Sequence, residues 1–295
     1  ISEIPVDGIG LFRTEFLYLN KTTSPTEDYL FEVYKNFVSK LNGKQMIIRT
    51  LDIGGDKKCP YIEIGDEANP FLGYRAIRYC LDHKDFFKTS LKAILRASAF
   101  GNIAIMYPMI SSIEEVRKAN LILDEAKQEL KNDNISFNEK IKVGVMVEIP
   151  AVAAMADMII EEVDFFSIGT NDLVQYATAV DRGNTKISKL YQWFNPGVIR
   201  LIKNTIDATK KYDDKFVGMC GEMAADPLGI ILLVGLGLDE FSVNINTIKK
   251  VKKYISLLSK KETEEFVKTL LDLKTVKEIE DKLNEFAEKK YGRFY

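Results

Sequence analysis

The sequence has no large excess of charge of either sign. Among its 295 residues there are 41 basic and 43 acidic side chains, which leaves a formal net charge of -2. Because such a chain creates no overall field that attracts a polyanion or an anionic bilayer, we expect no nucleic-acid partner and no membrane partner. Any charged ligand must therefore be bound by local clusters of side chains.

Cysteine and histidine are scarce. The three cysteines, Cys59, Cys80 and Cys220, are odd in number and lack the spacing of a metal site, which is typical of a reducing compartment. His83, the only histidine, falls among charged neighbours in a predicted helix, which indicates a surface residue. No apolar run reaches the roughly 18 to 20 residues of a membrane span, and no signal peptide opens the chain. We therefore expect a cytoplasmic protein.

Short apolar runs alternate with segments whose apolar residues have helical spacing. The runs lie at residues 6–13, 45–53, 102–110, 143–149, 164–169, 215–219 and 241–243. This alternation predicts an α/β protein with a parallel sheet, and the even rhythm without a GxGxxG motif favours a (β/α)8 TIM barrel, for which about 250 residues are typical. Only seven strands are visible. The first strand of the barrel either precedes Ile1, in which case the chain is part of a longer protein, or is irregular.

The composition changes near residue 259. From there to residue 295 lysine and glutamate dominate, and the apolar residues have the spacing of two helices. We predict that residues 1–258 form the barrel and that residues 259–295 form a C-terminal helical extension packed on it.

Polar side chains recur at one end of the predicted strands. They are Arg13 and Glu15, Arg49 and Asp52, Glu148, Asn171 and Asp172, and Cys220 and Glu222. In a barrel all these strand ends meet at one mouth, where active sites are built. Ion pairs at the rim are the structural alternative for the first two pairs. A helix cap is the alternative for Asn171 or Asp172.

These side chains suggest a site for a small anion. Glu148 and Asp172, two carboxylates from separate strands, are a usual arrangement for Mg2+ that also holds a substrate phosphate. Guanidinium groups bind phosphate and carboxylate oxygens, and the candidates are Arg13, Arg49, Arg75 and Arg182. A lone cysteine such as Cys220 is usually a small buried hydrophobe, but its place at a strand end favours an acid or a nucleophile.

Six blocks of sequence resemble a known family, in order and over nearly the whole chain. They are residues 8–16 (GIGLFRTEF), 49–57 (RTLDIGGDK), 69–76 (NPFLGYRA), 147–151 (VEIPA), 167–172 with 179–184 (SIGTND, AVDRGN) and 218–222 (GMCGE). Together they resemble the C-terminal, phosphoenolpyruvate-binding domain of Enzyme I of the bacterial sugar phosphotransferase system. The resemblance implies a dimeric TIM barrel that binds phosphoenolpyruvate with Mg2+ and releases pyruvate.

The resemblance also implies roles for individual residues. Arg13, Arg49 and Arg182 match phosphate-binding arginines, while Arg75 and Asn171 match positions that help to hold the substrate. Glu148 and Asp172 match the Mg2+ ligands. Cys220 matches the acid that protonates the enolate carbon.

The family's phosphoryl acceptor is a histidine in a separate N-terminal domain, which passes the group to the phosphocarrier protein HPr. No such histidine motif occurs here, so we expect binding without complete transfer. The family has glycine where Ala225 stands beside the site. Two other readings stay open. One is the related barrel of pyruvate phosphate dikinase or phosphoenolpyruvate synthase, and the other is a non-catalytic, phosphoenolpyruvate-sensing dimer module.

Overall fold

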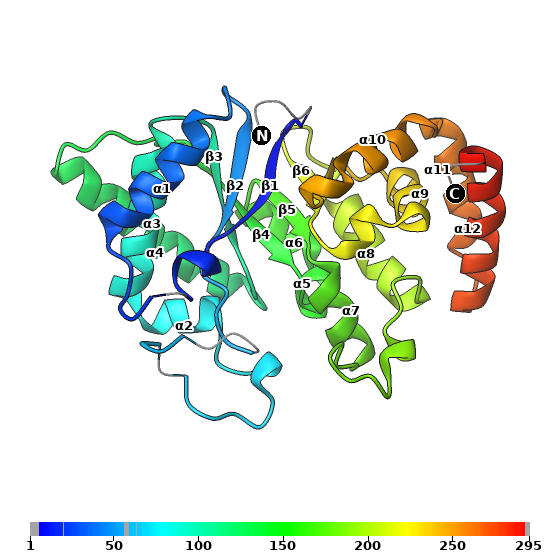
Figure 1. The fold of residues 1–295 in the computed structure, drawn as a ribbon, viewed down its shortest axis with the longest axis horizontal. Helices are drawn as coiled ribbons and strands as arrows, with labels where there is room; N and C mark the ends of the chain where they lie inside the picture. The colour runs from blue at the N-terminus through cyan, green and yellow to red at the C-terminus, as the bar shows by residue number, and fades with distance from the viewer. Residues whose placement is uncertain (1–5, 20, 56–58, 63, 293–295) are drawn as a thin grey trace. The chain divides into compact units, whose positions relative to one another are not determined.

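The computed structural model describes residues 6–19, 21–55, 59–62 and 64–292. The strands follow one another in the sheet in chain order, and every described pairing is parallel (Figure 1). They are β1 (Gly8–Arg13), β2 (Gln45–Arg49), β3 (Ile103–Tyr107), β4 (Lys142–Val147), β5 (Phe165–Ile168), β6 (Phe216–Met219) and β7 (Glu240–Phe241). The predicted α/β barrel class is confirmed. Over the described residues these seven strands are present and no eighth one.

The chain divides into two compact units. Unit 1 comprises Ile1–Met146 and Glu162–Asp164, and unit 2 comprises Val147–Glu161 and Phe165–Tyr295. Strands β1 to β3 and nearly all of β4 belong to unit 1, whereas β5, β6 and β7 belong to unit 2. The predicted division of the chain after residue 258 stays a prediction.

The helices of unit 1 cover its strands. They are α1 (Glu27–Ser39), α2 (Ile77–Asp82), α3 (Lys84–Ser98) and α4 (Ile113–Asn132). Helix α1 begins directly after Thr26, whose hydroxyl accepts a hydrogen bond from the Tyr29 N–H and caps the first turn. Helix α1 packs on α3, and α3 packs on α4 (Figure 1). The α1 face that is buried carries Leu30, Tyr34 and Val38, four residues apart.

Residues 73–99 have the apolar spacing of a single helix, but the helix is interrupted at His83. Its backbone, with φ -111° and ψ 65°, lies outside the helical region between α2 and α3. The His83 ring stacks on Tyr79 with 3.9 Å between centroids, and its Nδ1 lies 3.0 Å from the Tyr79 carbonyl oxygen. The His83 N–H still donates to the Tyr79 carbonyl oxygen and the His83 carbonyl oxygen still accepts from the Phe87 N–H, each at 3.0 Å, so the break lies in the His83 backbone angles and not in lost hydrogen bonds. His83 is exposed, as predicted.

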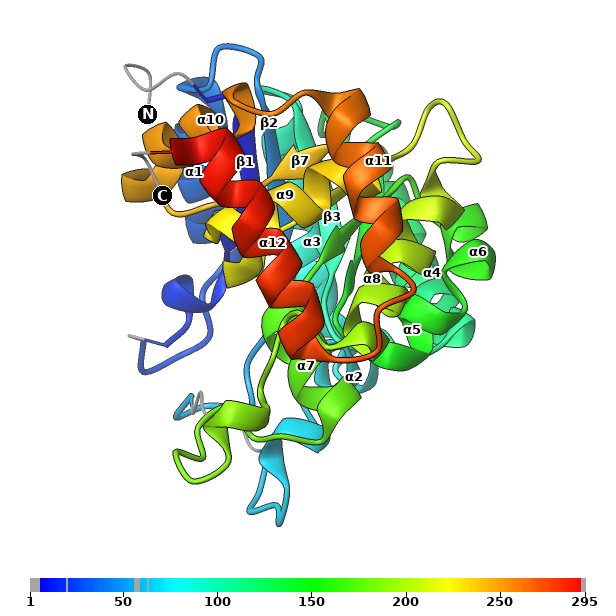
Figure 2. The ribbon, with the colours of Figure 1, turned by 90° about the vertical axis from the view of Figure 1, so that its right-hand side faces the viewer.

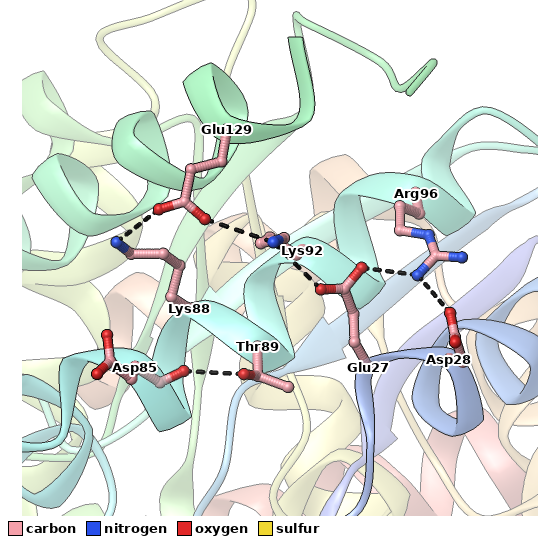
Figure 3. Close-up of polar contacts among 8 residues, drawn as sticks. All are labelled: Glu27, Asp28, Asp85, Lys88, Thr89, Lys92, Arg96 and Glu129. Atoms are coloured by element: carbon pink, nitrogen blue, oxygen red, sulfur yellow. Dashed lines mark hydrogen bonds and ion pairs between the residues drawn. The ribbon is translucent and has the colours of Figure 1, made fainter. Parts of the chain in front are cut away.

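An ion-pair network joins three helices of unit 1 (Figure 3). Lys92 on α3 lies 3.4 Å from Glu27 of α1 and 3.4 Å from Glu129 of α4. Arg96 reaches Glu27 at 2.6 Å, and Lys88 reaches Glu129 at 2.8 Å. All five side chains are partly exposed, so each ion pair by itself contributes little to the stability of the fold. The pairs stabilise the three helices mainly because they share side chains in one network.

Unit 2 contains eight described helices. They are α5 (Pro150–Ala154), α6 (Ala156–Ile159), α7 (Thr170–Thr178), α8 (Pro196–Thr209), α9 (Pro227–Leu236), α10 (Ile248–Ser256), α11 (Lys260–Leu270) and α12 (Val276–Tyr291). The two helices predicted over residues 259–295 are present as α11 and α12.

Helix α9 explains how the C-terminal helices are held. Its sequence is apolar on every side, so it is stable only when neighbours cover it all round. Helices α10, α11 and α12 pack on α9 (Figure 2). Gly235 permits this close approach, because a Cβ atom there would lie 2.3 Å from a Val267 methyl group of α11. Over the described residues, no helix is both long and apolar enough to cross a membrane.

Candidate functional site

The first group of candidate residues lies at the ends of β1 and β2 in unit 1. Arg13 is the last residue of β1, is exposed, and stands in register with Arg49, the last residue of β2. The Thr14 hydroxyl donates to the Arg49 carbonyl oxygen at 3.0 Å, which ties the two strand ends together. The parallel register therefore brings two of the predicted phosphate-binding arginines to neighbouring positions.

Arg49 and Arg75 are held by one buried carboxylate. Asp52 accepts from Arg75 Nη2 at 2.7 Å through Oδ1, and its Oδ2 lies 3.1 Å from Arg49 Nη2. Arg49 also forms an ion pair with Glu15. All four side chains are less than 10% exposed, so water cannot replace these contacts. Each guanidinium group is thus positioned by carboxylates before any ligand arrives.

The expected rim ion pairs are only partly correct. Arg49 pairs with Asp52 as the structural alternative proposed, but Glu15 pairs with Arg49 and not with its near neighbour Arg13. The reason is burial. Glu15 is 2% exposed and Arg49 is 6% exposed, whereas the Arg13 side chain is open to solvent. A buried carboxylate requires a buried counter-charge.

Glycine at position 54 lets the loop after β2 run against Arg75. Gly54 has φ +114°, and a Cβ atom there would lie 2.4 Å from the Arg75 Cβ. The Ala76 N–H donates to the Ile53 carbonyl oxygen at 3.0 Å, which fixes the loop beside the start of α2. Residues 56–58, part of the same motif, lie outside the described residues.

The second group lies in unit 2, where three chain segments are joined at the carboxyl ends of their strands. The Gly169 N–H donates to the Val147 carbonyl oxygen at 3.0 Å, and the Cys220 N–H donates to the Ile168 carbonyl oxygen at 3.0 Å. Glu148 follows Val147 directly. The backbone therefore places Glu148, the start of α7 and Cys220 at successive strand ends.

Asn171 and Asp172 do not cap α7. The capping position is Gly169, which has no side chain, and both residues lie in the first turn. The Asn171 amide instead exchanges two contacts with Glu222: its Oδ1 accepts from the Glu222 N–H at 3.0 Å, and its Nδ2 lies 3.4 Å from Oε1. Asp172 is 8% exposed and lies in the first turn of α7.

Arg182 and Cys220 lie close to these residues. Arg182 Nη1 is 3.9 Å from Asp172 Oδ1, and the Arg182 N–H donates to the Gln175 side chain at 3.0 Å. Cys220 is partly buried, with its Sγ 3.7 Å from the Ile168 carbonyl oxygen. Its thiol thus lies at the end of β6, in the place where the sequence predicts an acid or nucleophile.

Gly221 permits the close approach of β6 to α7. A Cβ atom on Gly221 would lie 1.8 Å from the Thr170 hydroxyl oxygen and 2.7 Å from the Thr170 backbone nitrogen. No side chain can therefore be placed at this position without moving the start of α7, which carries Asp172.

The sequence reasoning missed Tyr191. Its hydroxyl donates to the Asn171 carbonyl oxygen at 2.9 Å. Burial, with smaller contributions from Glu222 and Asp172, raises the pKa of Tyr191 to about 12, so the phenol keeps its proton. The sequence signal that could have identified Tyr191 is a pair of aromatic residues, Tyr191 and Trp193, in a polar loop.

The donor set of unit 2 fits a magnesium ion. Glu148 is 2% exposed and Asp172 is 8% exposed, and both follow strand ends that share a backbone hydrogen bond. Over the described residues no group of three or more acidic, cysteine or histidine side chains could hold a metal ion, so a Mg2+ ion at Glu148 and Asp172 would need water and phosphate oxygens in its other positions.

Parallel strands in chain order, with charged residues after their carboxyl ends, define an α/β barrel of the class that binds its ligand at the strand ends. The crystal structure of a citrate lyase from Burkholderia xenovorans LB400 has a similar fold, with a TM-score of 0.51 over 89% of this chain and 79% of that chain. At 13% identity this similarity shows the fold alone.

The family follows from the sequence comparisons. The model of the family described as "PEP-utilising enzyme, PEP-binding domain" matches residues 1–259, so the chain belongs to that family. Phosphoenolpyruvate-protein phosphotransferase of Geobacillus stearothermophilus is 50% identical over 92% of this chain and 47% of its own length. The protein of that name from Staphylococcus aureus (strain MSSA476) is 49% identical over 97% of this chain and 50% of its own. The chain thus spans about half the length of these relatives.

Proposed function

We propose that this chain binds phosphoenolpyruvate and supplies the phosphoryl-donor half of a phosphoenolpyruvate-protein phosphotransferase. The observation that carries the proposal is membership of the phosphoenolpyruvate-binding family across residues 1–259. Relatives at 49 to 50% identity bear the phosphotransferase name, which favours this function over a dikinase or synthase. An intact thiol at Cys220 argues against a purely sensing module, because binding alone needs no proton donor.

The arginines bind the anionic substrate in this proposal. Arg13, Arg49 and Arg182 contact the phosphoryl group, and Arg75 and Asn171 orient the substrate. Because Asp52 already orients Arg49 and Arg75, little side-chain entropy is lost when the ligand binds. Neutralising the phosphoryl oxygens stabilises the charge that spreads over them during transfer.

Glu148 and Asp172 would hold Mg2+, which supplies further charge neutralisation for the phosphoryl group when bound. Cys220 donates its proton to the enolate carbon, so that pyruvate leaves. Glu222 and Tyr191 hold Asn171 in place through its side chain and backbone, respectively.

The phosphoryl acceptor in this proposal is a histidine of an N-terminal domain of the whole protein, which then passes the group to HPr. His83 is unsuited to this role because it lies between α2 and α3, stacked on Tyr79. We also propose that the protein is a homodimer, that it works in the cytoplasm, and that it takes part in sugar transport.

Calorimetric titration of phosphoenolpyruvate into the purified chain, with and without Mg2+, tests the proposal. We expect binding that depends on the metal and that Glu148→Ala abolishes. Glu139→Ala is the matched control, because Glu139 is an exposed carboxylate paired only with Lys131 among the described contacts. Absence of binding by a folded, unmutated chain would refute the proposal.

A further inference from the structure

The backbone of unit 1 turns sharply directly after Arg75. The Arg78 N–H donates to the Arg75 carbonyl oxygen at 3.1 Å, and Ala76 has φ 51° and ψ -123°. These angles are those of the second residue of a type II′ turn. Glycine dominates that position because a Cβ atom is strained there. The chain thus has an alanine where the backbone favours glycine.

Contacts on both sides keep Ala76 in this conformation. Ala76 is 1% exposed, and its N–H donates at 3.0 Å to the carbonyl oxygen of Ile53, in the loop after β2. Its carbonyl oxygen accepts from the Cys80 N–H of α2 at 3.1 Å. A strained residue persists only where its surroundings hold it, and these two hydrogen bonds do so for Ala76.

The segment before the turn is also fixed. The Glu67 carboxylate accepts from the Tyr74 N–H at 2.7 Å. The Arg78 guanidinium group donates to the carbonyl oxygens of Leu72 and Gly73 at 2.9 and 2.8 Å. A Cβ atom on Gly73 would lie 2.1 Å from Glu67 Oε2, so glycine leaves the room that the carboxylate needs. The backbone is therefore held both before and after the turn.

The Arg75 side chain has little choice of direction as a result. It is 3% exposed, and its Nη2 donates to Asp52 Oδ1 at 2.7 Å. The backbone of Gly54 lies directly against the Arg75 Cβ atom, since a Cβ atom on Gly54 would be 2.4 Å from it. Because the peptide between Arg75 and Ala76 is part of the turn, a relaxed turn would shift the Arg75 Cα–Cβ bond and loosen its contact with Asp52.

We propose that Ala76 is a positioning residue, whose strained turn holds the Arg75 guanidinium group against Asp52 in the orientation that an anion requires. The consequence for phosphoenolpyruvate rests on the proposed role of Arg75. Glycine at position 76 would form the turn without strain but would also permit other conformations. The fold would then gain stability while Arg75 lost its fixed direction.

Chemical modification of arginine tests this proposal without any substrate. Phenylglyoxal reacts with guanidinium groups, and mass spectrometry follows each arginine separately. In Ala76→Gly we expect Arg75 to react roughly 5-fold faster or more than in the unmutated chain, because local opening exposes it more often. Arg96, which pairs with Glu27 and Asp28 of α1, should react at an unchanged rate.

Thermal unfolding supplies the second measurement. Relief of the strained turn should raise the unfolding midpoint of Ala76→Gly by roughly 2–4 °C. A merely structural role for Ala76 would instead couple faster modification to a lower midpoint. Asn134→Gly is the matched control, because Asn134 also has a positive φ, 55°, but is exposed and follows α4. It should leave the Arg75 rate unchanged.

An Arg75 rate in Ala76→Gly within about twofold of the unmutated rate would overturn the proposal, and so would a lower unfolding midpoint. Calorimetric titration tests the consequence for the substrate, since the loss of a fixed Arg75 should weaken phosphoenolpyruvate binding roughly 3- to 10-fold. An unaltered affinity would overturn that consequence. If the unmutated chain does not bind phosphoenolpyruvate, the proposed function fails, while the modification rates still decide the role of Ala76.

Discussion

Asp52→Asn should destabilise unit 1 strongly. The Asp52 carboxylate contacts Arg75 at 2.7 Å and Arg49 at 3.1 Å, and the three side chains are 3%, 3% and 8% exposed. Asparagine keeps the shape but removes the negative charge that both guanidinium groups face. Because breaking a buried ion pair costs roughly 3–5 kcal/mol, we expect the free energy of unfolding to fall by about that amount.

Urea unfolding followed by far-ultraviolet circular dichroism measures this loss. Glu139→Gln is the control, because its pair with Lys131 is exposed and should contribute less than about 1 kcal/mol. The loss for Asp52→Asn should also persist at high salt, since buried charges are poorly screened. A change within about 1 kcal/mol of the unmutated chain would falsify the view that Asp52 organises this arginine pair.

Three further predictions concern other parts of the chain. Because Glu240 is buried, the folded protein holds its proton more tightly than the unfolded chain, with a pKa of about 7 against 4.5, so stability falls as pH rises between these values. In the unmutated chain the free energy of unfolding should fall by up to about 3 kcal/mol between about pH 5 and pH 8, and Glu240→Gln should abolish this fall. Urea unfolding at the two pH values measures it, and the same pH dependence in both chains would contradict the prediction. Gly221→Ala should weaken phosphoenolpyruvate binding at least tenfold, because the alanine Cβ would lie 1.8 Å from the Thr170 hydroxyl oxygen. Calorimetric titration measures the affinity, and an unaltered affinity would contradict the prediction. Lys92→Met should lower the free energy of unfolding by about 1 kcal/mol at low salt and by less at high salt, as urea unfolding measures it. A loss that does not depend on salt would show that Lys92 stabilises the helices by packing and not by its charge.

Much of the fold is legible in the sequence because its signals are local. The apolar runs and the helical spacing predict the strands and most helices, including the two helices after residue 259, which are α11 and α12. The polar residues after each strand also follow from the sequence, since chain direction alone decides that Arg49, Glu148 and Cys220 come at carboxyl ends. The roles of these residues as substrate, metal and proton sites stay predictions.

Only the tertiary structure decides which of these groups meet. Glu15 pairs with Arg49, 34 residues away, because both are buried, and nearness in sequence to Arg13 does not predict this. Asn171 bonds with Glu222 across 51 residues, although Glu222 is exposed, because the fold brings the start of α7 beside the end of β6. Ser167, Gly218 and Glu240 are paired on neighbouring strands through strand register, which sequence periodicity leaves open. Side-chain partners depend on register and burial over long separations, whereas strands and helices depend on neighbours a few residues away.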